Sequence, residues 1–231
     1  MNLIFRKLLH IRLQPIRIFC FHQVSDEFDP STMWECDWTQ IDVFKQKILR
    51  IKKQYTFISL PEATEKLKHD TFRRKKYAVL TADDGWDSLK NILPWLAEQQ
   101  IPITLFVNPC YLDGVHKQER ATEKLLTQAD LMSLSNKYAG ITIGSHGWTH
   151  VDTSKMDKKE FLMNIHNAET VLCQYDNKIP FYAFTYGRYK SEFFNVLTKN
   201  NLIPVLMDGQ LNYSFNGVIH RECIDGDKLC I

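Results

Sequence analysis

The chain has 231 residues, of which 44% are hydrophobic and 12% aromatic, enough to bury one large core or two small ones. Its 29 lysine and arginine residues nearly balance its 27 acidic residues, and the formal charge of +2 points neither to nucleic acid nor to an acidic membrane as a partner. A local basic run at residues 73–76 precedes a predicted strand, where a solvated loop is the simplest interpretation.

Strands and helices are predicted to alternate along the chain. In chain order we expect a strand over 16–21, a helix over 41–55, a strand over 55–60, a helix that begins at Pro61, and a strand over 77–82. A helix over 89–96, a strand over 103–107, a helix capped by Thr127, and a strand over 141–143 follow. A helix over 161–175, a strand over 181–184, a helix over 192–199 and a strand over 203–207 complete the pattern.

This alternation predicts an α/β fold with a parallel sheet and outer helices. Polar residues follow the carboxyl ends of several predicted strands: His22, Asp83, Asp84, His146 and the turn at 185–187. In a closed β/α barrel these strand ends share one rim, where active sites assemble. An open doubly wound sheet is the alternative, because the same residues could meet at its switch point. The barrel accounts for more of the residues at once.

Two short clusters predict a metal site. Asp83 and Asp84 follow the strand over 77–82, and His146 and His150 follow the strand over 141–143. Two imidazoles four residues apart and one carboxylate, Asp84, make a set of three ligands that leaves a coordination position open for water. These ligands suit zinc first, with cobalt, nickel or iron as alternatives. Unrelated surface or core histidines are the simpler interpretation of HxxxH alone.

Asp83 is then free to act as a general base. Adjacent side chains on an extended backbone point in different directions, so Asp83 and Asp84 need not both bind the metal. A carboxylate within reach of a metal-activated water can take its proton. A hairpin turn or a helix cap would also explain Asp-Asp-Gly, but it would not explain the two histidines.

Three motifs resemble, in the same order along the chain, motifs of the polysaccharide deacetylase family, whose members are also known as NodB-homology or carbohydrate esterase family 4 enzymes. Residues 81–85 (TADDG) resemble the TFDDG motif, residues 145–150 (SHGWTH) the SHxxxH motif, and residues 184–188 (FTYGR) the motif often seen as PYG. The resemblance spans roughly residues 16–207. It implies an irregular, seven-stranded, TIM-like β/α barrel and metal-dependent removal of N-acetyl groups from amino sugars of a polysaccharide or glycan precursor.

The resemblance also implies roles for single residues. Asp83 matches the catalytic base, Asp84, His146 and His150 match the metal ligands, and the backbone N–H of Tyr186 matches the donor that helps to hold the oxyanion. Residues 19–24 (FCFHQV) resemble the YHxV segment of a branch that handles biofilm and surface polysaccharides, which implies that His22 is the general acid. His220, near the C-terminus, is the competing candidate.

The chain departs from the family pattern in its third motif. Thr185 stands where proline is common, and no arginine starts the motif, because Tyr182 and Ala183 precede Phe184. Arg188 and Arg221 are the two candidates to brace the catalytic aspartate instead. These departures favour one alternative function, that of a catalytically weak glycan-binding relative. A hydrolase of another non-peptide amide is a second alternative, since no feature of the sequence excludes it.

The remaining expectations concern the cysteines, the compartment and the partners. None of the six cysteines forms a CxxC pair, which predicts reduced and mostly buried thiols. Charged residues and Pro15 interrupt the N-terminal apolar stretch, so we expect no signal peptide, no membrane span and a cytoplasmic location. We expect one domain over residues 1–231 and a carbohydrate partner that contains an N-acetylated amino sugar, with no nucleic acid; the oligomeric state stays open.

Overall fold

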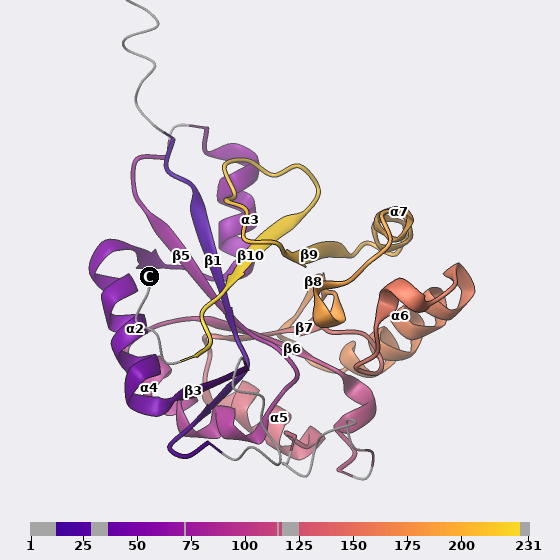
Figure 1. The fold of residues 1–231 in the computed structure, drawn as a ribbon, viewed down its shortest axis with the longest axis horizontal. Coiled ribbons are helices and arrows are strands. Elements are labelled where there is room, and N and C mark those ends of the chain that lie inside the picture. Colours follow the sequence, from indigo (N-terminus) through magenta and orange to yellow (C-terminus); the bar gives the residue numbers. More distant parts are fainter. Residues whose placement is uncertain (1–12, 29–36, 72, 115, 117–124, 227–231) are drawn as a thin grey trace, which may run out of the picture.

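Seven parallel strands close into a barrel at the centre of the molecule (Figure 1). The structure is a computed structural model that describes residues 13–28, 37–71, 73–114, 116 and 125–226. Around the ring the order is β1, β10, β9, β8, β7, β6, β5, and β5 pairs back onto β1 along its whole length. The strands are β1 (Ile16–Phe21), β5 (Tyr77–Ala82), β6 (Ile103–Val107), β7 (Ile141–Ser145), β8 (Lys178–Ala183), β9 (Ile203–Met207) and β10 (Ile219–Cys223).

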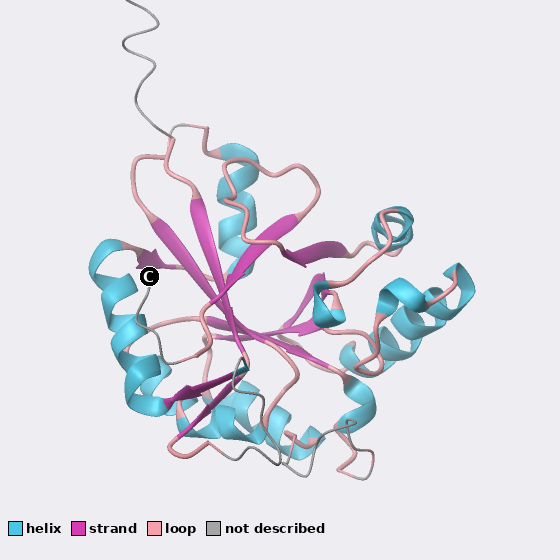
Figure 2. Cartoon of the chain, in the orientation of Figure 1, coloured by secondary structure: helices cyan, strands magenta, loops and turns pink. Residues whose placement is uncertain are grey.

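Helices surround the barrel, with α6 and α7 on one side and α2, α4 and α5 on another (Figures 1 and 2). The helices are α2 (Ile41–Gln54), α3 (Leu60–His69), α4 (Leu93–Glu98), α5 (Gln128–Lys137), α6 (Lys158–Leu172) and α7 (Glu192–Lys199). Short 3-10 turns in the described part of the chain include η2 (Asp87–Asn91), η3 (Pro109–Tyr111), η4 (Thr153–Lys155) and η5 (Thr185–Gly187). A short strand, β4 (Thr56–Phe57), adds to the start of β5, and β2 (Gln23–Ser25) pairs with β3 (Trp38–Gln40). The predicted barrel is confirmed.

Local sequence explains where the helices begin. Thr127 caps α5 by accepting a hydrogen bond from the backbone N–H of Asp130, whose carboxylate accepts the N–H of Thr127 in return. Asp157 and Glu160 form the same reciprocal box at the start of α6. Ser59 caps α3, with a proline in its first turn. The predicted cap at Thr127 is confirmed.

The core has an inner part and an outer part. Ile18, Val79, Ala183, Val205 and Ile219 come from strands on different sides of the ring and belong to one buried cluster, so they fill the interior of the barrel. The other two clusters pack the outer faces of the strands against the helices: one holds Phe19, Phe21, Phe44, Ile48 and Leu80, and the other Phe161, Tyr182, Phe184, Phe193 and Leu197. Strands β5 and β6 are thus buried on both faces along nearly their whole length, which is why they read as continuous apolar runs.

Three expectations about elements need correction. The single helix predicted over 89–96 is η2 followed by α4, with Pro94 in the first turn of α4, where proline needs no hydrogen-bond partner. The strand predicted over 55–60 shortens to β4, because Leu60 already belongs to α3. The sequence reading also missed β2, β3 and β10, which are short or mix polar and apolar residues.

Two further expectations, one about the burial of the cysteines and one about the basic run at 73–76, need correction. The thiols are not mostly buried: Cys20 is buried, but Cys173 and Cys223 are exposed, whereas Cys36 and Cys230 lie outside the described residues. The basic run at 73–76 is not wholly a solvated loop, because Arg73 is buried and its guanidinium donates to the backbone carbonyls of Lys66 and Asp70. Within the described ranges, each helix is too short or too polar to cross a bilayer.

Candidate active site

The predicted metal ligands meet at the carboxyl ends of β5 and β7. One oxygen of Asp84, Oδ1, lies 3.3 Å from Nε2 of His146 and 3.2 Å from Nε2 of His150. The three potential ligand atoms lie within 4.8 Å of one another. Asp84 and His146 are buried, and the His150 side chain is 10% exposed, so the cluster has one side open to solvent.

Their surroundings fit a divalent cation. Oδ1 of Asp84 is buried and has no hydrogen-bond partner, because neither imidazole contact has hydrogen-bond geometry. Nδ1 of His146 donates to the carbonyl of Ala183 at 2.9 Å, which orients the ring so that its Nε2 faces the carboxylate. A buried, unpartnered carboxylate oxygen that faces two imidazole nitrogens fits the donor set of a three-ligand metal site.

The other oxygen of Asp84 is held by an aromatic side chain two residues along the chain. The indole N–H of Trp86 donates to Oδ2 of Asp84 at 3.1 Å, and Trp86 is only 6% exposed. Trp86 therefore orients the carboxylate instead of offering an open aromatic surface. Burial raises the pKa of Asp84, but the imidazoles of His150 and His146 outweigh it and hold that pKa well below its ordinary value.

Two asparagines hold the loop between the histidines. The side-chain amide of Asn108 donates to the carbonyl of His146 at 2.6 Å, and the amide oxygen of Asn164 accepts the N–H of Trp148 at 3.0 Å. Gly147 has a φ of 81°, and a Cβ there would lie 2.6 Å from that oxygen of Asn164. Only glycine therefore fits this turn.

Asp83 is paired with Arg221, not with the metal cluster. Nη1 and Nη2 of Arg221 donate to the two carboxylate oxygens of Asp83 at 2.7 and 2.8 Å, and both side chains are almost fully buried. Burial raises the pKa of Asp83, but the charge of Arg221 outweighs it, and the pKa lies below its ordinary value. The other candidate, Arg188, is exposed and pairs with Asp152. Arg221 thus takes the place of the missing motif arginine.

His22 follows β1 on the same rim, and one of its ring nitrogens lies within 4.8 Å of an Asp83 carboxylate oxygen. Its Nδ1 lies 2.6 Å from Oδ2 of Asp225, and its backbone N–H donates to Oδ1 at 3.0 Å. Burial lowers the pKa of His22, but the Asp225 carboxylate outweighs it and raises the pKa well above its ordinary value. His220 pairs instead with Asp208, outside this cluster.

Tyr186 lies in the turn that follows β8. Its φ of 56° is in the left-handed region, and its ring is 47% exposed. The ring meets His150 edge to face, with 4.4 Å between the ring centres. The structure therefore brings together His22, Asp83, Asp84, His146, His150 and Tyr186, and it leaves His220 and Arg188 elsewhere.

The comparisons with known proteins identify the family and the fold. Residues 71–205, more than half of the chain, match the family described as polysaccharide deacetylase. The chain belongs to the polysaccharide deacetylase family. No curated protein matches its sequence.

Solved structures of deacetylases share the fold. The structure of IcaB from Ammonifex degensii is similar with a TM-score of 0.78 at 15% identity, covering 94% of both chains. The deacetylase PplD of Streptococcus pyogenes, in complex with acetate, has a TM-score of 0.75 at 18% identity and covers 91% of this chain and 92% of its own. A de-N-acetylase from Aggregatibacter actinomycetemcomitans has a TM-score of 0.74 at 13% identity and covers 92% of this chain and 95% of its own.

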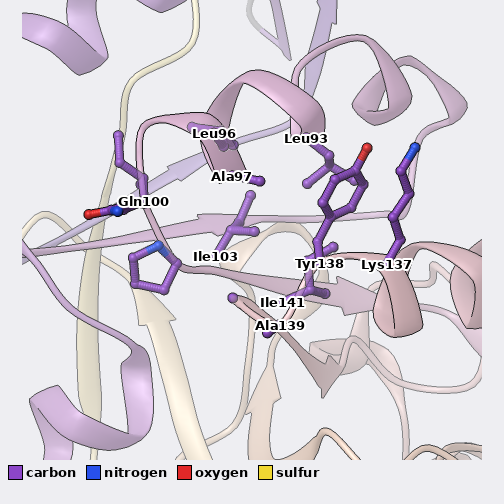
Figure 3. A pocket seen from close by; sticks show the side chains of 12 residues that line it. Leu93, Leu96, Ala97, Gln100, Ile103, Lys137, Tyr138, Ala139 and Ile141 are labelled. Carbon is purple, nitrogen blue, oxygen red and sulfur yellow. The ribbon is translucent and has the colours of Figure 1, made fainter.

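A cavity of about 320 Å³ lies at the other end of this deacetylase fold (Figure 3). Ile103 and Ile141, the first residues of β6 and β7, line it together with Leu93 and Leu96 of α4. It is mainly apolar and contains none of the predicted site residues. The polar cluster at the strand ends, not this cavity, is the candidate site.

Sequence reasoning missed the residues that support the site from a distance. Asn108 could have been found, because it directly follows β6, as Asp83 follows β5. Asn164 lies within α6 and carries no comparable signal. Arg221 is one of the two arginines that the sequence offered as the partner of Asp83, but the choice between it and Arg188 could not be inferred, because Arg221 lies on β10, the strand that was not predicted. Asp225, the partner of His22, follows the same strand and was missed.

Proposed function

We propose that this protein is a metal-dependent deacetylase that hydrolyses the N-acetyl group of an amino sugar in a polysaccharide or glycan precursor. The observation that carries the proposal is the buried, unpartnered Oδ1 of Asp84 opposite Nε2 of His146 and Nε2 of His150. Family membership supports hydrolysis of an amide, and the ligand set supports zinc, with cobalt, nickel or iron as alternatives.

A divalent ion held by Asp84, His146 and His150 would supply a Lewis acid for the acetamido carbonyl and an activated water. Asp83 takes the proton of the attacking water as general base. Because Arg221 keeps its pKa low, Asp83 is ionised and ready to accept at neutral pH. The guanidinium also fixes the direction of both carboxylate oxygens.

His22 protonates the leaving amine. The carboxylate of Asp225 accepts from Nδ1, so the ring can hold a proton at neutral pH and present its second nitrogen, Nε2, to the substrate. The backbone N–H of Tyr186, in the left-handed turn beside His150, is the proposed donor to the oxyanion.

The first experiment separates the base from the metal ligands. We expect Asp83→Asn to lower the rate of chito-oligosaccharide deacetylation by about 10²–10⁴-fold, because it removes general base catalysis. Metal content should stay unchanged, as measured on the purified variant, whereas His146→Ala should lose metal. An unaffected rate in Asp83→Asn would reject the base role, and sugar binding without turnover in the wild type would favour a glycan-binding relative.

The second experiment identifies the acid. An aryl acetate ester has a leaving group that needs no proton, whereas an N-acetyl sugar does. His22→Gln should therefore lose amide hydrolysis and keep ester hydrolysis, whereas Asp83→Asn should lose both. His220→Gln is the matched control, because His220 pairs with Asp208 away from the cluster. Equal losses of both activities in His22→Gln would remove the general-acid role.

A further inference from the structure

A second cluster of metal-ligating side chains lies beside the first. Cys223, His22 and Asp225 offer Sγ, a ring nitrogen and a carboxylate oxygen that lie within 4.8 Å of one another. Sγ of Cys223 lies 3.1 Å from Oδ2 of Asp225, and Nδ1 of His22 lies 2.6 Å from the same oxygen. The reaction proposed above uses His22 and Asp225, but it gives the thiol no role.

We propose that Cys223, His22 and Asp225 form an inhibitory site for a thiophilic divalent cation such as Zn²⁺, separate from the site at Asp84, His146 and His150. Thiolate, imidazole and carboxylate are the three ligand types that zinc uses in proteins. Zinc at its usual bond lengths holds its ligands about 3.3–3.8 Å apart, so Sγ of Cys223 and Nδ1 of His22 each need to move less than about 1 Å away from Oδ2 of Asp225.

The net charge of the cluster permits a divalent cation to replace the protons on Cys223 and His22. With His22 protonated, the cluster carries one negative charge on Asp225, one positive charge on the imidazole and a neutral thiol. When the cation binds, the thiol and Nδ1 of His22 each release one proton to solvent, and a thiolate, a neutral imidazole, a carboxylate and a doubly charged cation remain. Both states have a net charge of zero, so binding adds no unpaired charge to a largely buried site.

The solvent exposure of two of these ligands and the fixed position of the third also suit a bound cation. Cys223 is exposed and the His22 side chain is 19% exposed, so a cation can enter and keep a water ligand. The Asp225 side chain is 1% exposed, and its Oδ1 accepts the backbone N–H of His22, which leaves Oδ2 directed at the other two ligand atoms.

A neighbouring set of candidate ligands cannot serve in the same way. Cys20, His22 and Asp83 also lie within 4.8 Å of one another. The guanidinium of Arg221 already occupies this set, however, because it donates to both oxygens of Asp83 and to Sγ of Cys20. A fixed positive charge between these groups excludes a second cation.

The expected consequence is inhibition by excess zinc, which rests on the general-acid role proposed for His22. A cation on Nδ1 replaces the proton there and leaves a neutral imidazole, whose Nε2–H is a much weaker acid than that of the imidazolium and therefore does not protonate the leaving amine efficiently. Since a general acid contributes about 10²-fold or more, full occupancy should lower deacetylation by about a hundredfold.

Cobalt separates the two sites without any activity measurement. The Asp84 site contains no sulfur, so of these two sites only the one at Cys223 can give a near-ultraviolet thiolate-to-cobalt charge-transfer band. Titration of the metal-free protein with Co²⁺ should produce this band in the wild type and in His146→Ala. Cys223→Ser should lack it, and Cys173→Ser, which changes another exposed thiol, should keep it. A band that persists in Cys223→Ser, or no band in the wild type at excess cobalt, would overturn the site.

Zinc inhibition is then compared within each variant as the ratio of rates with and without excess Zn²⁺. This ratio should be about one hundredth in the wild type and in Cys173→Ser, and it should be near one in Cys223→Ser. An equal fall in Cys223→Ser would refute inhibition through this site. If the protein deacetylates nothing, the cobalt band still decides whether the second site exists.

Discussion

The buried pair between Asp83 and Arg221 yields the sharpest test of how the barrel is held together. Replacing Arg221 by methionine keeps much of the side-chain volume but leaves the Asp83 carboxylate, 3% exposed, without its cation. Breaking a buried pair in this way destabilises a protein by about 3–5 kcal/mol. We expect a loss of that size for the metal-free protein at pH 7, measured by urea unfolding.

The loss should depend on pH in a defined direction. In the wild type the pKa of Asp83 is depressed, so the pair's contribution is present above the unfolded pKa of about 3.9 and is lost as the pH falls through the folded value. In Arg221→Met, burial without the cation raises the folded pKa, and protonation relieves the carboxylate. The difference between the two proteins should therefore shrink from pH 7 towards pH 4.

Two controls make the test decisive. Arg188→Met removes a guanidinium that is 64% exposed, and we expect a change within about 0.5 kcal/mol. Asp83→Asn should be less harmful in the Arg221→Met background than in the wild type, because it removes the unpaired charge. If Arg221→Met costs no more than Arg188→Met, or if the two sites show no coupling, the proposed pairing is wrong.

Other predictions concern the loop, a cap and the metal. Gly147→Ala should lower stability more than Gly209→Ala, because a Cβ at 147 would lie 2.6 Å from a side-chain oxygen, whereas nothing lies within 4 Å of one at 209; equal losses in thermal unfolding would contradict this. Thr127→Ala should cost about 1 kcal/mol by removal of the cap on α5, and an unchanged urea midpoint would argue against it. In a Cys223→Ser background, Zn²⁺ at 100 times its Kd should add about 2.7 kcal/mol of stability, and His146→Ala should abolish the gain.

Several parts of the fold could be predicted because their signals are local. The strands over 77–82, 103–107 and 203–207 begin and end with the apolar runs of the sequence. A parallel strand that is buried on both faces needs apolar residues throughout. The cap at Thr127 depends on residues three positions apart. By contrast, β10 mixes Ile219 with charged residues, one of which, Arg221, points into the barrel to meet Asp83, so no apolar run marks it.

The amino-acid sequence alone determined the two loops that carry the candidate metal ligands, since Asp84 follows one buried strand and the pair His146 and His150 follows another. Only the tertiary structure decided which side chains support them. Closure of the barrel places β10 beside β1 and thereby brings Arg221 to Asp83, and Asp225 to His22, across 138 and 203 residues of chain. Pairings at such separations depend on which strands become neighbours, and no local pattern of residues records that choice.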